Sequence, residues 1–168
     1  FRANGVDAEF AGHPLVDEFN FTASKFACRK ALGIAEKGPV VAILPGSRQQ
    51  EVGRLLPAAL KAAGIIKNEI PSAQFIVSKS QGIKTGMIRG LLEKYGVEAA
   101  VSADPLCALK AADVSLVKSG TITLEAALMP APMIIIYKLS SLSYSIMKFF
   151  AKIPFIGLPN IVAGRKIV

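Results

Sequence analysis

Histidine and cysteine are scarce in this sequence. The 168 residues contain two cysteines, Cys28 and Cys107, and one histidine, His13. These residues lie far apart along the chain and match no ligand spacing of a zinc site. Such a pair of cysteines fits reduced, cytoplasmic thiols better than a disulfide framework. The sequence therefore predicts no metal site and no cofactor, and we expect both cysteines to be small buried residues.

Long apolar runs and charged residues are also scarce. No uninterrupted apolar stretch approaches the roughly 18 residues of a membrane-spanning helix, and the N-terminal residues lack the pattern of a signal peptide. Charged residues make up 19% of the chain and apolar residues 52%. This balance excludes a disordered tail and predicts one domain with a substantial core. The mean hydropathy of +0.45 suggests that some apolar surface contacts another domain, another subunit or lipid.

Acidic residues are outnumbered by basic ones. The chain has 20 lysines and arginines against 12 aspartates and glutamates, a formal net charge of +8. This excess favours an anionic partner, such as nucleotide phosphates or anionic lipid. Nucleic acid is disfavoured as a partner because the basic residues are scattered. Neither an aromatic RNA-binding pattern nor zinc-finger spacing is present.

Short apolar runs alternate with helix-like segments along the chain. The continuous run VVAIL, Val40–Leu44, is typical of a parallel strand that is covered on both faces. We expect further strands at 74–78, 98–102, 114–117 and 132–138. We expect helices at 49–69, with a break between Gly53 and Pro57, and at 83–96, 105–112, 119–129 and 142–152. This order predicts an α/β fold with a Rossmann-like, doubly wound parallel sheet, which binds ligands at the carboxyl ends of its strands.

The turn after the first strand has the features of an anion site. In the stretch LPGSRQQEV, Ser47 and Gln50 fit a capping box at the start of a helix. Gly46 allows a tight turn or close approach to a ligand, and Arg48 adds a forked cation beside the free helix N–H groups. Such a helix start favours phosphate. An ordinary turn with a solvated arginine is the alternative interpretation.

The turn after 114–117 repeats this arrangement. Ser119, Gly120 and Thr121 offer backbone N–H groups and two hydroxyls, which suit a diphosphate. Glu125 follows one helical turn later and could accept hydrogen bonds from ribose hydroxyls, although a first-turn acid is also stabilised by the helix dipole alone. Two such turns in one wound sheet predict a nucleotide site.

Four stretches, taken together, resemble the lipid-A-disaccharide synthases: GHPLVDEF (12–19), LPGSRQQEV (44–52), SGTITLEAALMPAPMIIIYK (119–138) and LPNIVAGRKIV (158–168). The resemblance covers essentially the whole chain. It implies one half of a GT-B glycosyltransferase, the half that binds the UDP-sugar. The implied reaction transfers diacylglucosamine from UDP-diacylglucosamine to diacylglucosamine 1-phosphate, without a metal and with inversion, to form the lipid A disaccharide and UDP.

The resemblance also implies a division of the protein into domains. Residues 1–20 are expected to form an interdomain linker, and residues 21–168 the C-terminal UDP-sugar-binding domain. Within the linker, His13 and Asp17 fit either a hinge or the cleft. The resemblance implies that an N-terminal acceptor domain and a C-terminal tail lie outside the chain, and we expect a longer protein also because the chain begins with Phe1 rather than Met. The acceptor domain is expected to supply the catalytic base, so the chain alone should be inactive.

By the same resemblance, individual residues acquire expected roles. Arg48 should face the diphosphate, with Gly46 and Ser47 forming the turn behind it. Phosphate oxygens should bind to Ser119, Gly120 and Thr121, and the ribose to Glu125. Asn160 and Arg165 should line the cleft near the donor, although Asn160 fits a turn residue after Pro159 equally well.

The segment 144–157, YSIMKFFAKIPFIG, places aromatic residues beside lysines. Such a pattern is typical of an interfacial helix, and a core helix with solvated lysines is the alternative. Because the implied substrates are bilayer lipids, we expect Tyr144, Phe149, Phe150 and Phe155 to contact the membrane. The protein should then be cytoplasmic and peripheral on the inner membrane of a Gram-negative-type bacterium. Whether it forms a homodimer is left open.

Two other functions remain compatible with the sequence. One is another GT-B-like UDP-sugar enzyme, such as an epimerase or a peptidoglycan glycosyltransferase. The other is a non-catalytic nucleotide-binding module. The segment 144–157 favours a lipid substrate, and the motif LPNIVAGR favours the lipid-A-disaccharide synthases over other UDP-sugar enzymes. The absence of an initial Met argues against a stand-alone module.

Overall fold

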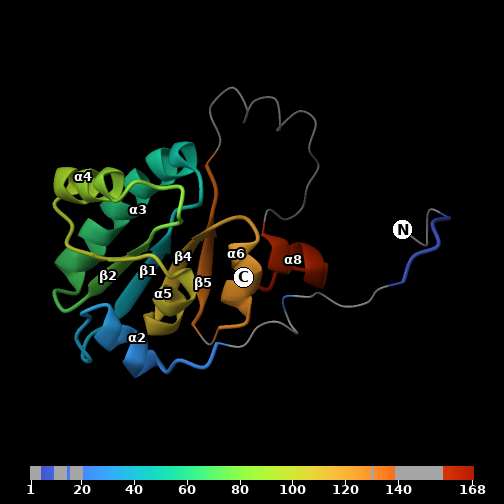
Figure 1. Ribbon diagram of the computed structural model, residues 1–168, viewed down its shortest axis with the longest axis horizontal. Helices are drawn as coiled ribbons and strands as arrows, with labels where there is room; N and C mark the ends of the chain where they lie inside the picture. Colours follow the sequence, from blue (N-terminus) through green and yellow to red (C-terminus); the bar gives the residue numbers. More distant parts are fainter. Residues whose placement is uncertain (1–4, 10–14, 16–20, 130, 139–156) are drawn as a thin grey trace.

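The structure is a computed structural model, and it describes residues 5–9, 15, 21–129, 131–138 and 157–168. Among these residues, five parallel strands form one sheet in the order β3-β2-β1-β4-β5 (Figure 1). The strands are β1 (Val40–Leu44), β2 (Gln74–Ser78), β3 (Ala100–Ser102), β4 (Val114–Lys118) and β5 (Met133–Ile136). The described helices are α2 (Lys25–Ala31), α3 (Gln49–Glu69), α4 (Thr85–Tyr95), α5 (Pro105–Ala111), α6 (Ile122–Ala127) and α8 (Leu158–Ala163).

The sheet is doubly wound, as the sequence predicts. The chain runs outward from β1 to β2 and β3, and then crosses back to β4 and β5 on the other side of β1. Helices α3 and α4 cover one face of the sheet, and α2, α5 and α6 lie on the other (Figure 1). The α/β, Rossmann-like fold class is therefore confirmed.

The central strand β1 is buried on both faces, which explains its uninterrupted apolar sequence. Val41 and Ile43 pack in the cluster with α3 and α4. Ala42 and Leu44 pack on the opposite side with α5 and α6. Because neighbouring strand residues point to opposite faces, no polar side chain would be tolerated along this strand. Full burial of each large side chain contributes about 1.5–3 kcal/mol.

Helix α3 is continuous, so the predicted break between Gly53 and Pro57 is wrong. Pro57 lies inside the helix and cannot donate to the carbonyl of Gly53 four residues earlier. Gly53 is exposed, so water can bind the carbonyl that proline leaves unpaired. Burial of Val52, Leu56 and Leu60 on both sides of the proline holds the helix against the sheet.

Two other helix boundaries follow the sequence signals. Helix α4 ends at Tyr95, and Gly96 follows it as the C-cap with φ +62. Helix α5 begins with Pro105 at its first position, and the Asp104 side chain accepts from the amides of Leu106 and Cys107. By contrast, α6 begins at Ile122 rather than 119, because residues 119–121 form the turn after β4.

The cysteines are both free. Cys28 is buried as predicted, whereas Cys107 is only partly buried. Burial, followed by the neighbouring Cys28 and Asp104, raises the pKa of Cys107 to about 12. The thiol therefore stays protonated at neutral pH.

Several predictions fall outside the described residues. These are the helix expected at 142–152, the hinge or cleft roles of His13 and Asp17, and the membrane contacts of Tyr144, Phe149, Phe150 and Phe155. Within the part of the chain that the structure describes, no helix is both long and apolar enough to cross a bilayer.

Candidate functional site

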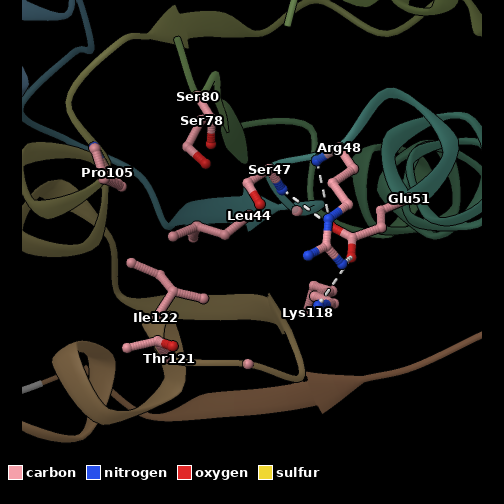
Figure 2. Close-up of a pocket in the computed structure, with 12 residues that line it drawn as sticks. Leu44, Ser47, Arg48, Glu51, Ser78, Ser80, Pro105, Lys118, Thr121 and Ile122 are labelled. Carbon is pink, nitrogen blue, oxygen red and sulfur yellow. Dashed lines mark hydrogen bonds and ion pairs between the residues drawn. The ribbon is translucent and has the colours of Figure 1, made fainter. Parts of the chain in front are cut away.

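A cavity of about 340 Å³ lies where the winding of the sheet reverses. Residues from the carboxyl ends of β1, β2 and β4 surround it, and the starts of α3, α5 and α6 complete its walls. Wound parallel sheets bind ligands at such a switch point. Figure 2 shows Arg48, Glu51 and Lys118 together on one side of this cavity.

The turn after β1 is built around Gly46 and Glu51. Gly46 has φ +117, a backbone conformation that strains residues with a Cβ. A Cβ on Gly46 would also lie 2.6 Å from Oε2 of Glu51. Glycine is therefore required here both by the turn and by the close approach of the carboxylate.

The predicted capping box of Ser47 and Gln50 is wrong by one residue. Helix α3 begins at Gln49 with Arg48 as N-cap, so the third helical residue is Glu51. Its Oε2 accepts from the backbone N–H of Ser47 at 3.1 Å and of Arg48 at 3.3 Å. A carboxylate is a stronger acceptor than an amide for these helix-start donors. Ser47 keeps a different role, because it is exposed and lines the cavity.

Glu51 also joins the turns after β1 and β4. Its Oε1 lies 3.1 Å from Nζ of Lys118 and 3.5 Å from Nη1 of Arg48. The Glu51 and Lys118 side chains are each about one-fifth exposed, whereas Arg48 is 82% exposed. Burial alone would raise the pKa of Glu51, but Lys118 and the two backbone amides hold that pKa below its ordinary value. The carboxylate is therefore ionised at neutral pH.

The end of β4 and the turn after it supply another part of the cavity wall. Lys118, the last residue of β4, lines the cavity beside Glu51, and Gly120 and Thr121 of the turn also line it. Ser119 does not, and its backbone N–H donates to the Ile136 carbonyl of β5 at 3.0 Å. The hydroxyl of Thr123 donates to the Gly120 carbonyl at 2.6 Å and so fixes the turn at the start of α6.

Four polar residues of this cavity were not predicted from the sequence: Glu51, Ser78, Ser80 and Lys118. Ser78 ends β2 and Ser80 follows it, so both reach the same sheet edge as the turns already recognised. The signal was present, because a polar residue that ends or directly follows a buried parallel strand lies at the ligand-binding edge.

Besides Ser119, three predicted site residues lie outside the cavity wall: Glu125, Asn160 and Arg165. Glu125 is partly buried in α6, and burial raises its pKa. Asn160 is buried in α8, where its Oδ1 accepts from the N–H groups of Ile167 and Val168 and its amide donates to the Val168 carbonyl. Arg165 is exposed, and along the sequence it lies between Asn160 and the two residues that Asn160 binds.

The cavity suits an anion better than a cation. Its two cations, Arg48 and Lys118, face one carboxylate, and the start of α3 adds its positive dipole end. Hydroxyls of Ser47, Ser78, Ser80 and Thr121 add neutral hydrogen-bonding groups. In the described parts of the chain, no group of three or more histidine, cysteine or acidic side chains could hold a metal ion.

Comparisons with known proteins give a consistent result. A family model described as "Lipid-A-disaccharide synthetase" matches residues 1–168. A lipid-A-disaccharide synthase of Paraburkholderia xenovorans is 40% identical over 166 residues, which is 98% of this chain and 43% of that protein. The enzyme of Syntrophus aciditrophicus is 41% identical over 99% of this chain and 44% of its own length. This chain therefore spans less than half the length of these curated relatives.

The solved structures include one weaker likeness. The N-terminal domain of Candida albicans trehalose-6-phosphate phosphatase aligns with a TM-score of 0.44 and 16% identity. The alignment covers 75% of this chain and 31% of that chain.

Proposed function

The chain belongs to the lipid-A-disaccharide synthetase family, and from that premise we propose that it is the donor-binding part of a glycosyltransferase of lipid A biosynthesis. The proposed reaction moves diacylglucosamine from UDP-diacylglucosamine to diacylglucosamine 1-phosphate and releases UDP. Because the chain spans 43% of the Paraburkholderia relative, we assign the acceptor site and the catalytic base to residues that such relatives have outside this stretch. Residues 21–168 then form the donor domain and residues 1–20 the linker to the rest.

The observation that supports this proposal most directly is the pair of cations beside a helix start at the sheet's switch point. Arg48 and Lys118 line one cavity with the first turn of α3. A diphosphate fits this combination, because helix N–H groups, a forked guanidinium and an ammonium all favour phosphate oxygens. In the proposed reaction these groups stabilise the charge that develops on the leaving UDP.

The remaining donor contacts follow from the positions of the other residues. The turn after β1 contributes Ser47 to the cavity wall, and the turn after β4 contributes Gly120 and Thr121. These residues would hold phosphate oxygens. Ser119 anchors the turn through Ile136 of β5. Glu125, in the helix that starts at this turn, is proposed to accept from the ribose hydroxyls.

We assign the C-terminal residues a supporting role. Asn160 ties Ile167 and Val168 to α8 through three hydrogen bonds. This tether restricts the short segment that contains Arg165. We propose that Arg165 reaches the donor sugar or diphosphate in the complete cleft, and that Asn160 positions it there.

The proposed substrates also require contact with a membrane. Diacylated sugars are poorly soluble in water, because each CH₂ group left in water costs about 0.8 kcal/mol. We therefore propose that segment 144–157 rests on the cytoplasmic leaflet of the inner membrane as a peripheral contact. Lys138, exposed just beyond the end of β5, would add to the attraction of anionic lipid.

Calorimetry of UDP, ADP and uridine binding to the 168-residue chain tests the nucleotide assignment. We expect UDP to bind more tightly than ADP or uridine. In NMR spectra of the chain titrated with UDP, we expect the largest backbone amide shifts at residues 46–48 and 119–121. Equal binding of UDP and ADP, or shifts confined to other parts of the chain, would contradict the proposal. A sugar-transfer assay tests whether the catalytic base lies outside this chain. Sugar transfer by this chain alone would show that no other segment supplies the base.

A further inference from the structure

Glu51 occupies the place in the cavity that best suits a phosphate oxygen. Four donors converge on its carboxylate: the backbone N–H groups of Ser47 and Arg48, the ammonium of Lys118 and the guanidinium of Arg48. These are the groups to which the proposed function assigns the diphosphate. An internal anion therefore stands where the ligand's anion is expected.

The arrangement is specific to this site and is not an ordinary surface ion pair. Glu51 is about one-fifth exposed, and its close approach to the turn is possible only because Gly46 has no side chain. The ion pair with Lys118 joins segments that are 67 residues apart in the sequence and lie at the two sides of the switch point. Two negative ligand oxygens and this carboxylate cannot share the same donors without strong repulsion.

A second cavity gives the carboxylate an alternative position. This cavity, of about 200 Å³, is also lined by Arg48, Glu51 and Lys118. Arg54 and Lys138 line it as well, and neither lines the first cavity. Glu51 thus stands between the candidate donor cavity and a second cavity that has two additional cations. Rotation of its side chain toward Arg54, one helical turn further along α3, would keep the carboxylate paired.

We propose that Glu51 is a built-in competitor for the ligand diphosphate, which binds by displacing the carboxylate from the Ser47 and Arg48 amides and Lys118 into the second cavity. This inference rests on the proposed function and specifies how its anion site works. Glu51 lowers the affinity of the site for the diphosphate and so speeds the release of UDP after transfer. Arg54 and Lys138 stabilise the displaced carboxylate and therefore assist ligand binding without contacting the ligand.

The first test compares Glu51→Gln with the parent 168-residue chain. Glutamine retains an oxygen that can accept from the two turn amides, but it no longer pairs with Lys118 or repels phosphate. We expect UDP and inorganic pyrophosphate to bind roughly tenfold more tightly to the variant, and uridine to bind equally to both. The matched control is Glu69→Gln at the other end of α3, roughly 27 Å away along the helix, where salt screens the same change in charge. Equal or weaker UDP and pyrophosphate binding by Glu51→Gln would overturn the inference and make Glu51 a structural brace.

The second test measures the coupling between Glu51 and Arg54. Arg54→Gln should weaken UDP binding in the parent chain by more than it does in the Glu51→Gln background, because only a charged carboxylate needs Arg54 when displaced. Additive effects of the two substitutions would exclude displacement toward Arg54.

The pyrophosphate arm separates this inference from the proposed function. Tighter pyrophosphate binding by Glu51→Gln, together with no preference for UDP over ADP, would support the displaced carboxylate and reject the uridine nucleotide. Failure of the parent chain and of the variant to bind pyrophosphate or UDP would overturn both.

Discussion

Asp113 and Arg29 form an ion pair at the amino end of the sheet, on the side away from the candidate site. Oδ2 of Asp113 accepts from Nη2 of Arg29 and from the backbone N–H of Val40, each at 2.8 Å. Arg29 is buried and also donates to the carbonyls of Ala111 and Glu36. This network joins α2 to the beginnings of β1 and β4 and the end of α5.

We predict that Arg29→Met destabilises the fold and leaves the cavity intact. The substitution removes the ion pair with Asp113, which keeps Lys25 and the Val40 amide as partners. It also removes the donor to the carbonyls of Ala111 and Glu36, and an unsatisfied group costs about 1–3 kcal/mol where it is buried. Because Asp113 is partly exposed, we expect the total loss of unfolding free energy to lie near the lower end of that range. Urea unfolding should report the loss, and UDP affinity under native conditions should not change. A parallel loss of UDP affinity in the folded variant would contradict the separation of this network from the site.

The same network predicts a dependence of stability on acid. Burial alone would raise the pKa of Asp113, but Lys25, the Val40 amide and Arg29 hold that pKa below its ordinary value. A carboxyl whose folded pKa is lowered contributes stability above its unfolded pKa and loses that contribution as the pH falls through the folded pKa. The unfolding free energy should therefore fall more steeply below about pH 4 in the parent chain than in Asp113→Asn. Identical acid profiles for the two proteins would argue against this pair as a source of stability.

The sequence indicated the general architecture because its signals are local. Five buried apolar residues in a row identified β1, Gly96 marked the end of α4, and Pro105 marked the start of α5. Pro57 misled the prediction because its cost depends on solvent access to the Gly53 carbonyl. Helix α2 was missed because its seven residues are held by Arg29 through contacts 82 and 84 residues away.

The candidate site was only half predictable for a related reason. Both glycine-containing turns were recognised from short motifs, but Lys118 and Glu51 acquire their roles from each other. Their contact depends on β4 lying beside β1, and the order of strands in a sheet is not written in any local pattern. The shift of the helix cap from Ser47 to Arg48 likewise depends on the carboxylate that reaches back from Glu51.

Substitutions in the proposed donor site should separate diphosphate from ribose contacts. We predict that Arg48→Ala weakens UDP binding and leaves uridine binding unchanged, because uridine has no phosphate. A lost charge-assisted hydrogen bond corresponds to about 1.5–3 kcal/mol. Glu125→Ala should weaken both ligands, since ribose is common to them. If calorimetry shows the same pattern of UDP and uridine affinities for the two variants, these roles are wrongly assigned.

Gly46 provides a test of the turn itself. Gly46→Ala places a Cβ 2.6 Å from Glu51 Oε2 at φ +117, so we predict a loss of about 1–3 kcal/mol of unfolding free energy. The matched control is Gly64→Ala in α3, where a Cβ meets nothing within 4 Å and alanine should stabilise the helix by about 0.5–1 kcal/mol. Opposite signs in thermal or urea unfolding are expected. A neutral Gly46→Ala variant would mean that the turn relaxes without strain.

Three phenylalanines of the proposed membrane segment 144–157 lie outside the described residues. Replacement of Phe149, Phe150 and Phe155 with serine should reduce sedimentation of the chain with anionic vesicles and leave UDP affinity unchanged. The reason is that apolar rings enter the lipid interface while each nearby lysine adds about 1 kcal/mol of attraction to anionic lipid. Phe26→Ser is the matched control, because Phe26 is 55% exposed on α2 and belongs to no proposed membrane surface. Should the triple variant instead unfold with no specific loss of vesicle binding, the three rings are core residues and the membrane proposal fails, while the nucleotide site is unaffected.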